Sequence, residues 1–184
     1  MDLITNRLEQ LYSLETGKYW PVGPKTGQVL FDTCSQIKAQ KILELGTSTG
    51  VSSLFMLRWL AGIQGKLITV ESNFDRYHIA LETFQLTKMK KHVLPIFDHA
   101  PECFEYLNLE NLDMVFTDCI KKQTLEMFQL LMPCLRPGGV FLVDNVLSHP
   151  EAMQPFIEHL KANQITYELL EIESGLIRVY KEAI

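Results

Sequence analysis

A glycine-bearing loop and a later acid have residue types and a spacing that could do chemistry. Gly46 and Gly50 bracket a short loop between an apolar run and an apolar helical pattern. Glycine lets a chain turn sharply out of a strand and lets the backbone approach a ligand closely. Glu71 ends the next apolar run, 25 residues after Gly46, and an acid in that place can accept both hydroxyls of a ribose. Together, the loop and the acid favour a ligand that contains adenosine.

This loop differs from two common phosphate-binding motifs. It lacks the third glycine of the G-x-G-x-x-G dinucleotide motif, and no Gly-Lys-Ser/Thr follows it as in a P-loop. A nucleotide-dependent oxidoreductase is therefore disfavoured, although binding of NAD would restore that class. A plainer interpretation also stays open, because a glycine after a strand is often only a turn and an acid there is often solvated.

A second group of polar residues follows two later apolar runs. Asp118 ends one run, and Asp144 and Asn145 end the other. If these runs are neighbouring strands, the three side chains converge at one edge of the sheet. Two carboxylates and an amide oxygen are hard ligands that suit Mg²⁺, with Ca²⁺ or Mn²⁺ as alternatives. The plainer interpretation is that the aspartates only cap turns or helices.

The elements that must position these groups alternate along the chain. Short apolar runs predict strands at 41–46, 66–70, 92–97, 112–117 and 140–143. Helical spacing of apolar residues predicts helices at 3–14, 26–39, 51–61, 74–88, 101–107, 122–135 and 150–163. A turn-rich stretch occupies 17–27, and two β-rich runs, 165–172 and 176–181, flank Ser174 and Gly175 as in a hairpin.

Alternating strands and helices require right-handed crossovers and a parallel sheet that is covered on both faces. The chain is thus predicted to be a doubly wound α/β protein with a mostly parallel, seven-stranded sheet and a C-terminal antiparallel hairpin. In such open sheets, ligands bind outside the carboxyl ends of the strands. Both groups of polar residues follow strands, so both are expected at that edge.

Composition and charge narrow the function classes. The chain has 17 Lys and Arg against 22 Asp and Glu, a net charge of −5, which disfavours nucleic-acid binding. The cluster of Lys88, Lys90, Lys91 and His92 keeps that class open, although a solvated helix end is its plainer interpretation. The sequence has neither a signal-peptide pattern nor an apolar run near the roughly 20 residues that span a bilayer. The four cysteines lack zinc or disulfide spacing. We therefore expect a soluble, cytoplasmic protein without a membrane partner.

Four segments, taken in register, resemble the motifs of a known family. They are 22–28 (VGPKTGQ), 42–53 (ILELGTSTGVSS), 112–118 (LDMVFTD, with Lys121 following) and 140–146 (VFLVDNV). They are similar to the cation-dependent O-methyltransferases of the catechol and caffeoyl-CoA type, a group of the class I S-adenosylmethionine-dependent methyltransferases. The resemblance implies a Rossmann-like fold with an antiparallel last strand. It also implies one domain, 1–184, in which 1–40 forms helices and a segment that closes over the cofactor, and 41–184 forms the sheet core.

The resemblance also implies roles for individual residues. It assigns the S-adenosylmethionine contacts to Val22, Glu44, Gly46, Thr47, Ser48, Gly50, Ser52, Glu71, Ser72, Asp98, His99, Ala100 and Asp118. The divalent cation would be held by Asp118, Asp144 and Asn145. Lys121 and Asp118 would be the catalytic residues, with Lys121 as the general base. The implied reaction moves a methyl group from a sulfonium to a hydroxyl of a small aromatic acceptor.

The chain departs from this family's pattern near the acceptor. Only 146–150 separate Asn145 from the next helix, where the family often inserts a long covering loop. Glu168 aligns weakly with an acceptor-contacting acid, and Tyr19 and Trp20 either wall a substrate pocket or pack in the core. A small hydroxylated acceptor is the expected partner, nucleic acid is disfavoured but not excluded, and a homodimer stays open. The alternatives are methylation of an RNA base hydroxyl and a cofactor-binding module without turnover.

Overall fold

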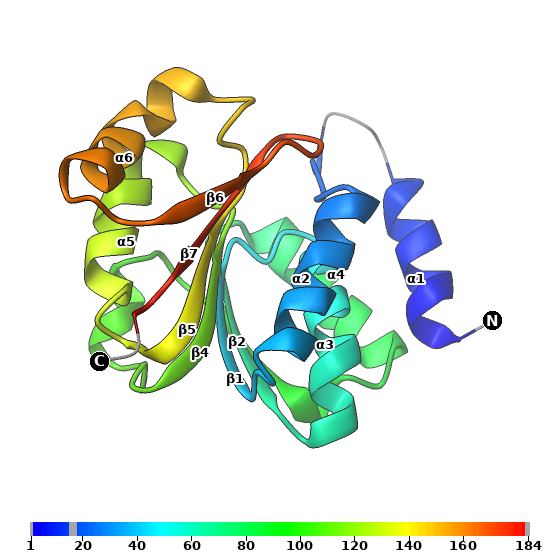
Figure 1. Ribbon diagram of the computed structural model, residues 1–184. Coiled ribbons are helices and arrows are strands. Elements are labelled where there is room, and N and C mark those ends of the chain that lie inside the picture. Colours follow the sequence, from blue (N-terminus) through cyan, green and yellow to red (C-terminus); the bar gives the residue numbers. More distant parts are fainter. Residues whose placement is uncertain (1, 15–17, 183–184) are drawn as a thin grey trace.

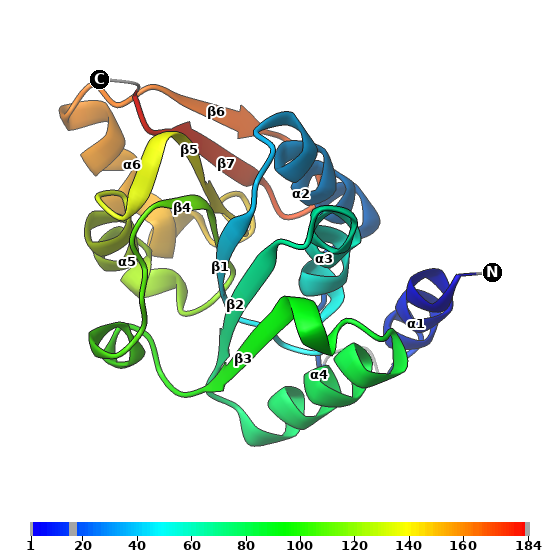
Figure 2. The same ribbon diagram turned by 90° about the horizontal axis from the view of Figure 1, so that it is seen from below.

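The computed structural model describes residues 2–14 and 18–182, which form helices and strands around one sheet. The strands are β1 (Lys41–Leu45), β2 (Lys66–Glu71), β3 (Val93–Phe97), β4 (Leu112–Thr117), β5 (Leu135–Val143), β6 (Tyr167–Leu170) and β7 (Leu176–Tyr180). They lie in the order β3-β2-β1-β4-β5-β7-β6 (Figures 1 and 2). Strands β1 to β5 pair in parallel, whereas β7 is antiparallel to β5 and β6. The predicted fold class, a mostly parallel seven-stranded sheet with a C-terminal antiparallel hairpin, is confirmed.

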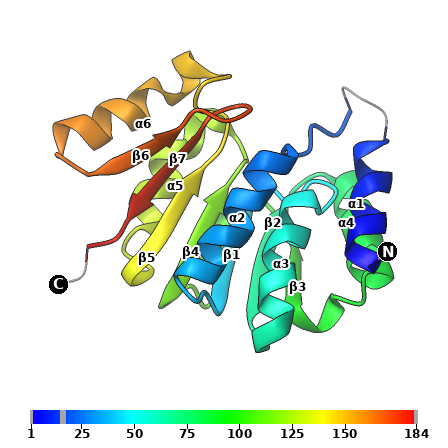
Figure 3. The same ribbon diagram turned by 45° about the vertical axis from the view of Figure 1, so that its right-hand side comes forward.

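Helices cover both faces of the sheet (Figures 1 and 3). One side holds α1 (Leu3–Tyr12), α2 (Pro24–Gln36), α3 (Val51–Ile63) and α4 (Phe74–Leu86), and the other holds α5 (Thr124–Leu131) and α6 (Pro150–Ala162). Each layer encloses its own apolar core. Along β4, Met114 and Phe116 belong to the first core and Val115 belongs to the second, because successive strand residues point to opposite faces. The inner strands β1, β2 and β4 are therefore buried on both sides, as their uninterrupted apolar runs predict, whereas the edge strands β3 and β6 are partly exposed.

The topology marks one edge of the sheet as the place for a ligand. Strands β2 and β3 extend from β1 in one direction, and β4 and β5 extend in the other. The strand order thus reverses between β1 and β4, and the loops after these two strands diverge to opposite faces. Open α/β sheets bind ligands in the crevice that such a reversal creates.

Strand β5 begins earlier than the sequence pattern predicts. A helix was expected to run to residue 135 and a strand to start at 140, because 136–139 (RPGG) is typical of a turn. Instead, Gly138 N–H donates to the Lys181 carbonyl oxygen at 2.9 Å, and Lys181 N–H donates to the Gly139 carbonyl oxygen at 2.8 Å. Pairing with the chain after β7 holds this segment extended, so tertiary hydrogen bonding overrides the local turn signal.

Smaller differences concern other parts of the chain. The helix predicted at 101–107 is only a 3₁₀ turn, Glu102–Glu105. A second 3₁₀ turn, Lys90–His92, follows α4. The expectation of a solvated cluster there is wrong for His92, which is 4% exposed and has its Nδ1 atom 3.2 Å from the Gly65 carbonyl oxygen. Gly17, where the predicted turn-rich stretch begins, lies outside the described residues. Within the described ranges, no helix has the length and apolar character needed to cross a membrane.

Candidate functional site

A cleft of about 940 Å³ lies at the carboxyl ends of the parallel strands. The loops after β1, β2, β3, β4 and β5 line it, together with the segment before α2 and the turn between β6 and β7. Gly46, Glu71, Asp118 and Asp144 all line this one cleft. The residues that the sequence offered for nucleoside and cation binding are therefore gathered around one cavity.

Gly46 is required where the loop after β1 passes the loop after β4. Its φ of +97° is in the left-handed region, which side chains rarely adopt. A Cβ atom on Gly46 would lie 2.8 Å from the Asp118 carbonyl oxygen. The missing side chain therefore allows the two loops to approach each other at the floor of the cleft.

Glu71 is fixed at the edge of the cleft by backbone groups from two loops. Ser48 N–H donates to Oε2 and Asn73 N–H donates to Oε1, each at 2.8 Å. The carboxylate is 6% exposed and still lines the cleft. Each carboxylate oxygen has a second lone pair, so Glu71 can accept further hydrogen bonds from a ligand. The Ser48 hydroxyl donates to the Tyr19 carbonyl oxygen at 3.1 Å, which attaches the segment before α2 to this loop.

Glu44 lies behind the glycine loop. Its buried carboxylate accepts hydrogen bonds from the hydroxyls of Ser52, Ser53 and Thr69, the last at 2.6 Å. Burial raises the pKa of Glu44 to about 7, although these three hydroxyls lower it. Glu44 therefore joins β1, β2 and the start of α3. Its direct contact with a cofactor stays a prediction.

The predicted cofactor contacts divide into two sets. The residues that line the cleft are Val22, Gly46, Ser48, Glu71, Ser72, Asp98, His99, Ala100 and Asp118. The residues that lie outside this lining, buried around the loop, are Glu44, Thr47, Gly50 and Ser52. Tyr19 and Trp20 also line the cleft. Trp20 is 69% exposed, so it is part of the cleft wall and is not core packing.

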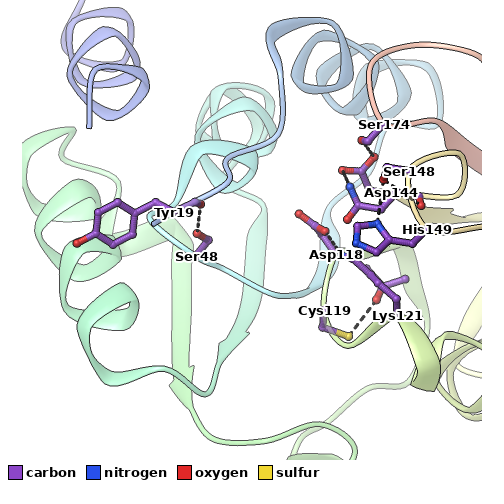
Figure 4. Close-up of polar contacts among 11 residues, drawn as sticks. Tyr19, Ser48, Asp118, Cys119, Lys121, Asp144, Ser148, His149 and Ser174 are labelled. Carbon is purple, nitrogen blue, oxygen red and sulfur yellow. Dashed lines mark hydrogen bonds and ion pairs between the residues drawn. The ribbon is translucent and has the colours of Figure 1, made fainter. Parts of the chain in front are cut away.

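The acidic residues lie across the cleft from Tyr19 and Ser48, and Figure 4 shows Asp118, Lys121, Asp144 and His149 gathered there. Lys121 forms an ion pair with Asp118. Burial raises the pKa of Asp118 to about 6, with Lys121 opposing the rise and Asp144 adding to it. The Lys121 ammonium group and the Asp118 carboxylate thus hold each other in a mostly buried position.

Asp144 is held by the turn between β6 and β7. It is 2% exposed, and the Ser174 hydroxyl donates to its Oδ1 atom at 2.7 Å. The Asn145 side-chain amide contacts the other carboxylate oxygen at 3.3 Å. Burial raises the pKa of Asp144, and the hydrogen bond from Ser174 opposes this rise.

The donor chemistry of this group fits a divalent cation. Asp144 is buried and Asp118 is half-buried, and both carboxylates line one cleft, so a cation between them would be attracted by both. Magnesium usually keeps several waters and binds only one or two carboxylates. In the described part of the chain, no three His, Cys, Asp or Glu residues are arranged to hold a metal ion. A cation here would therefore need the amide oxygen of Asn145 to complete the protein ligands.

The sequence did not indicate Glu173. Its carboxylate accepts the backbone N–H groups of Lys25 and Thr26, each at 2.9 Å, and it lines the cleft. These partners lie about 150 residues apart in the chain, so no local pattern could have linked them. Glu168, by contrast, forms an ion pair with Arg178 at 3.3 Å and is not among the residues that line the cleft. Further lining residues that were not anticipated are Arg76, Gln123, Ser148, His149 and Ser174.

Comparison with known proteins identifies the family of this chain. The profile of the O-methyltransferase family matches residues 4–178. The chain belongs to this family. The resemblance noted in four short segments therefore extends over nearly the whole chain, and the fold and the cleft are those of an O-methyltransferase family member.

Relatives within the O-methyltransferase family include catechol O-methyltransferases. The Bos taurus protein is 32% identical over 158 residues, which cover 83% of this chain and 57% of that protein. The Danio rerio catechol O-methyltransferase B is 30% identical over 161 residues, which cover 84% of this chain and 60% of that protein. The chain thus spans less than two thirds of the length of these two relatives.

Solved structures of methyltransferases share the fold. The O-methyltransferase from Bacillus cereus, solved with S-adenosylhomocysteine (SAH), has a TM-score of 0.85 and 22% identity, covering 98% of this chain and 92% of its own. A methyltransferase from Podospora anserina has a TM-score of 0.87 and 18% identity, covering 100% of this chain and 89% of its own. At these identities the similarity concerns the arrangement of helices and strands.

Proposed function

We propose that this chain is an S-adenosylmethionine-dependent O-methyltransferase that uses a divalent cation to methylate a hydroxyl of a small aromatic acceptor. The observation that carries the proposal is that one cleft is lined by Gly46, Glu71, Asp118 and Asp144. Two further facts support it. Relatives are named catechol O-methyltransferases, and structural neighbours were solved with SAM or SAH.

The cofactor end of the cleft is proposed to lie between the glycine loop and the ends of β2 and β3. Glu71 would accept the ribose hydroxyls, because its carboxylate is oriented by the N–H groups of Ser48 and Asn73. Asp98 to Ala100 line the cleft beyond Glu71 and would lie beside the adenine. The open backbone at Gly46 would leave room for the methionine part of the cofactor.

The cation end is proposed to be formed by Asp118, Asp144 and Asn145. When bound, S-adenosylmethionine would supply an electrophilic methyl group, and the cation would lower the pKa of the acceptor hydroxyl. Lys121 is the proposed base for the hydroxyl proton. Its ammonium form pairs with Asp118, and a divalent cation bound at Asp118 would compete for that carboxylate and favour the neutral amine, which can accept the proton. The remaining task of the protein is alignment, since a direct displacement needs the acceptor oxygen in line with the methyl group.

The acceptor would lie against the outer part of the cleft. Trp20 and Ile120 are large apolar side chains that line the cleft and are 69% and 57% exposed. Apolar groups that face a polar site suit a flat aromatic ring. Ser148 and His149 line the same cleft on the side of Asp144 and would offer polar contacts to substituents on that ring.

Calorimetry with SAH, with and without Mg²⁺, on the wild type and on Asp144→Ala tests this function. We expect SAH to bind both proteins, and we expect Mg²⁺ to strengthen binding of a catechol in the presence of SAH only in the wild type. Asp32→Ala removes an exposed carboxylate on α2, away from the cleft, and serves as the matched control that keeps the Mg²⁺ effect.

The outcomes separate the parts of the proposal. A wild type that does not bind SAH contradicts the methyltransferase function altogether. A Mg²⁺ effect that survives in Asp144→Ala contradicts only the cation site. SAH binding without methylation of catechol or related diols would instead indicate a binding module without turnover.

A further inference from the structure

A second hollow, of about 780 Å³, lies at the amino ends of the strands, opposite the cleft. The first residues of β1, β2 and β3 and the 3₁₀ turn Lys90–His92 line it, together with residues 106–108. Figure 2 shows these three strands side by side, with β3 at the edge of the sheet. The hollow has the size of a small-molecule site, and it has no part in the proposed methyl transfer.

The charge of this hollow is opposite to that of the whole chain. Its lining includes the four lysines Lys41, Lys66, Lys90 and Lys91, and none of the described residues that line it is an aspartate or a glutamate. The chain as a whole has a net charge of −5. Four cations without a neutralising carboxylate in the lining attract an anion with more than one negative charge.

Hydrogen bonds to neighbouring groups position three of the lysines. Lys41 Nζ donates to the Asn108 side-chain oxygen at 3.1 Å and to the Glu110 carbonyl oxygen at 2.9 Å. Lys66 Nζ donates to the Lys91 carbonyl oxygen, and Lys90 Nζ donates to the Gln85 side-chain oxygen at 3.1 Å. An ammonium group has three N–H donors, so each lysine can hold this position and also donate to an anion.

One wall of the hollow is apolar and exposed. Tyr106 and Leu94 line it and are 61% and 51% exposed. The Tyr106 hydroxyl donates to the Asp98 carboxylate, which fixes the direction of the ring. A fixed aromatic face beside a group of cations is the arrangement that binds a stacked base together with its phosphate.

We propose that this hollow binds a free nucleotide, with its phosphates on the lysines and its base against Tyr106. Lysine is a common phosphate ligand because it acts as a compact point charge. The volume of about 780 Å³ favours a single nucleotide as the ligand. The two sites share no lining residue, although Tyr106 of the hollow donates to Asp98 of the cleft, so we expect a nucleotide and S-adenosylmethionine to bind at the same time.

Calorimetry with UDP at low ionic strength, with and without saturating SAH, tests the proposal. UDP is chosen because it lacks adenine and does not resemble the adenosine of the cofactor. We expect saturable binding that SAH does not displace and that added salt weakens. Lys90→Glu with Lys91→Glu should weaken binding by about tenfold or more, because two attractions become repulsions. Lys122→Glu with Lys161→Glu, which makes the same change of net charge at exposed positions outside the hollow, should leave UDP affinity within about twofold.

The aromatic wall has its own test. Tyr106→Leu should weaken UDP binding while leaving pyrophosphate binding unchanged, and Tyr106→Phe, which keeps the ring, should retain most of the UDP affinity. Far-UV circular dichroism checks that each variant is folded. Three results would overturn the proposal: no saturable UDP binding at millimolar concentrations, displacement of UDP by SAH, or equal loss of affinity in the two double-lysine variants. Equal affinity for UDP and pyrophosphate would refute recognition of the base.

Discussion

Glu173 connects the turn between β6 and β7 to the start of α2, and replacing it with alanine should loosen one wall of the cleft. The carboxylate accepts the N–H groups of Lys25 and Thr26 at 2.9 Å each. The cap residue of α2 is Gly23, which has no side chain to accept these N–H groups. Glu173 therefore caps the helix from a distant part of the chain, and the segment that it fixes contains Tyr19 to Gly23 of the cleft lining.

The size of the effect follows from the loss of a cap and of a charge. Losing a helix N-cap acceptor costs about 1 kcal/mol, and losing an anion at a helix N-terminus costs about 0.3–1 kcal/mol. Glu173 is exposed, so solvent screening favours the lower part of this range. We expect Glu173→Ala to reduce the free energy of unfolding by about 1–1.5 kcal/mol, which lowers Tm by about 2–6 °C in a domain of this size.

The pH dependence of this effect has a definite sign. Burial raises the pKa of Glu173, but hydrogen bonds from Thr26 and Lys25 outweigh burial and lower the pKa below its ordinary value of 4.5. A carboxyl group with a lowered folded pKa stabilises the fold above its unfolded pKa, and this stabilisation is lost as pH falls through the folded pKa. The difference in stability between the wild type and Glu173→Ala should therefore shrink as the pH falls below 4.5.

Thermal unfolding and SAH calorimetry measure both consequences. If SAH must order the loosened segment before α2 at a cost of about 1 kcal/mol, the Kd for SAH rises about fivefold. Glu171→Ala is the matched control, because Glu171 is exposed on the same turn and should change neither Tm nor Kd. The reasoning is refuted if Glu173→Ala and Glu171→Ala unfold at the same temperature, or if the Tm difference does not depend on pH.

Three further predictions concern the cleft. In thermal unfolding, Gly46→Ala should destabilise the fold by about 1–3 kcal/mol, because its Cβ would meet the Asp118 carbonyl oxygen at a positive φ. The control Gly62→Ala, at a helical position with open space around it, should instead be stabilising in the same assay. Lys121→Met should lower kcat by about 10²–10⁴-fold while calorimetry shows unchanged SAH binding, and equal loss of both would contradict its role as a base. Burial raises the pKa of Glu44 from 4.5 to about 7, so the stability of the wild type should decline as the pH rises across this interval. Denaturant unfolding at several pH values should show that the free energy of unfolding of Glu44→Gln changes less with pH.

The convergence of Gly46, Glu71, Asp118 and Asp144 could be predicted from the sequence because it depends on few facts. Each residue follows an apolar run, and parallel strands bring their carboxyl ends to one edge of the sheet. Register within each strand therefore hardly matters. The result requires only that β2 and β4 lie on either side of β1 and that β5 lie next to β4, as they do.

What could not be predicted depends on contacts between distant segments. The start of β5 depends on backbone hydrogen bonds to Lys181, and these override the turn preference of 136–139. The burial of His92 depends on a contact with Gly65 across two strands. The hydroxyl contacts of Glu44 come from β2 and α3, so its sequence neighbours on β1 do not reveal that it lies behind the loop.

The turn between β6 and β7 explains how a short loop can form the side of the cleft that is proposed for the acceptor. Only residues 146–149 separate Asn145 from α6. The N–H groups of Leu147 and Ser148 donate to the Ser174 carbonyl oxygen at 3.0 and 3.1 Å, and the Ser174 hydroxyl donates to Asp144. One residue thus fixes both the loop and the candidate cation ligand. Because Glu173 beside it caps α2, the turn also sets the distance between the acceptor wall and the segment expected to close over the cofactor. Acceptor size would then be selected by a fixed rim, without closure of a long loop.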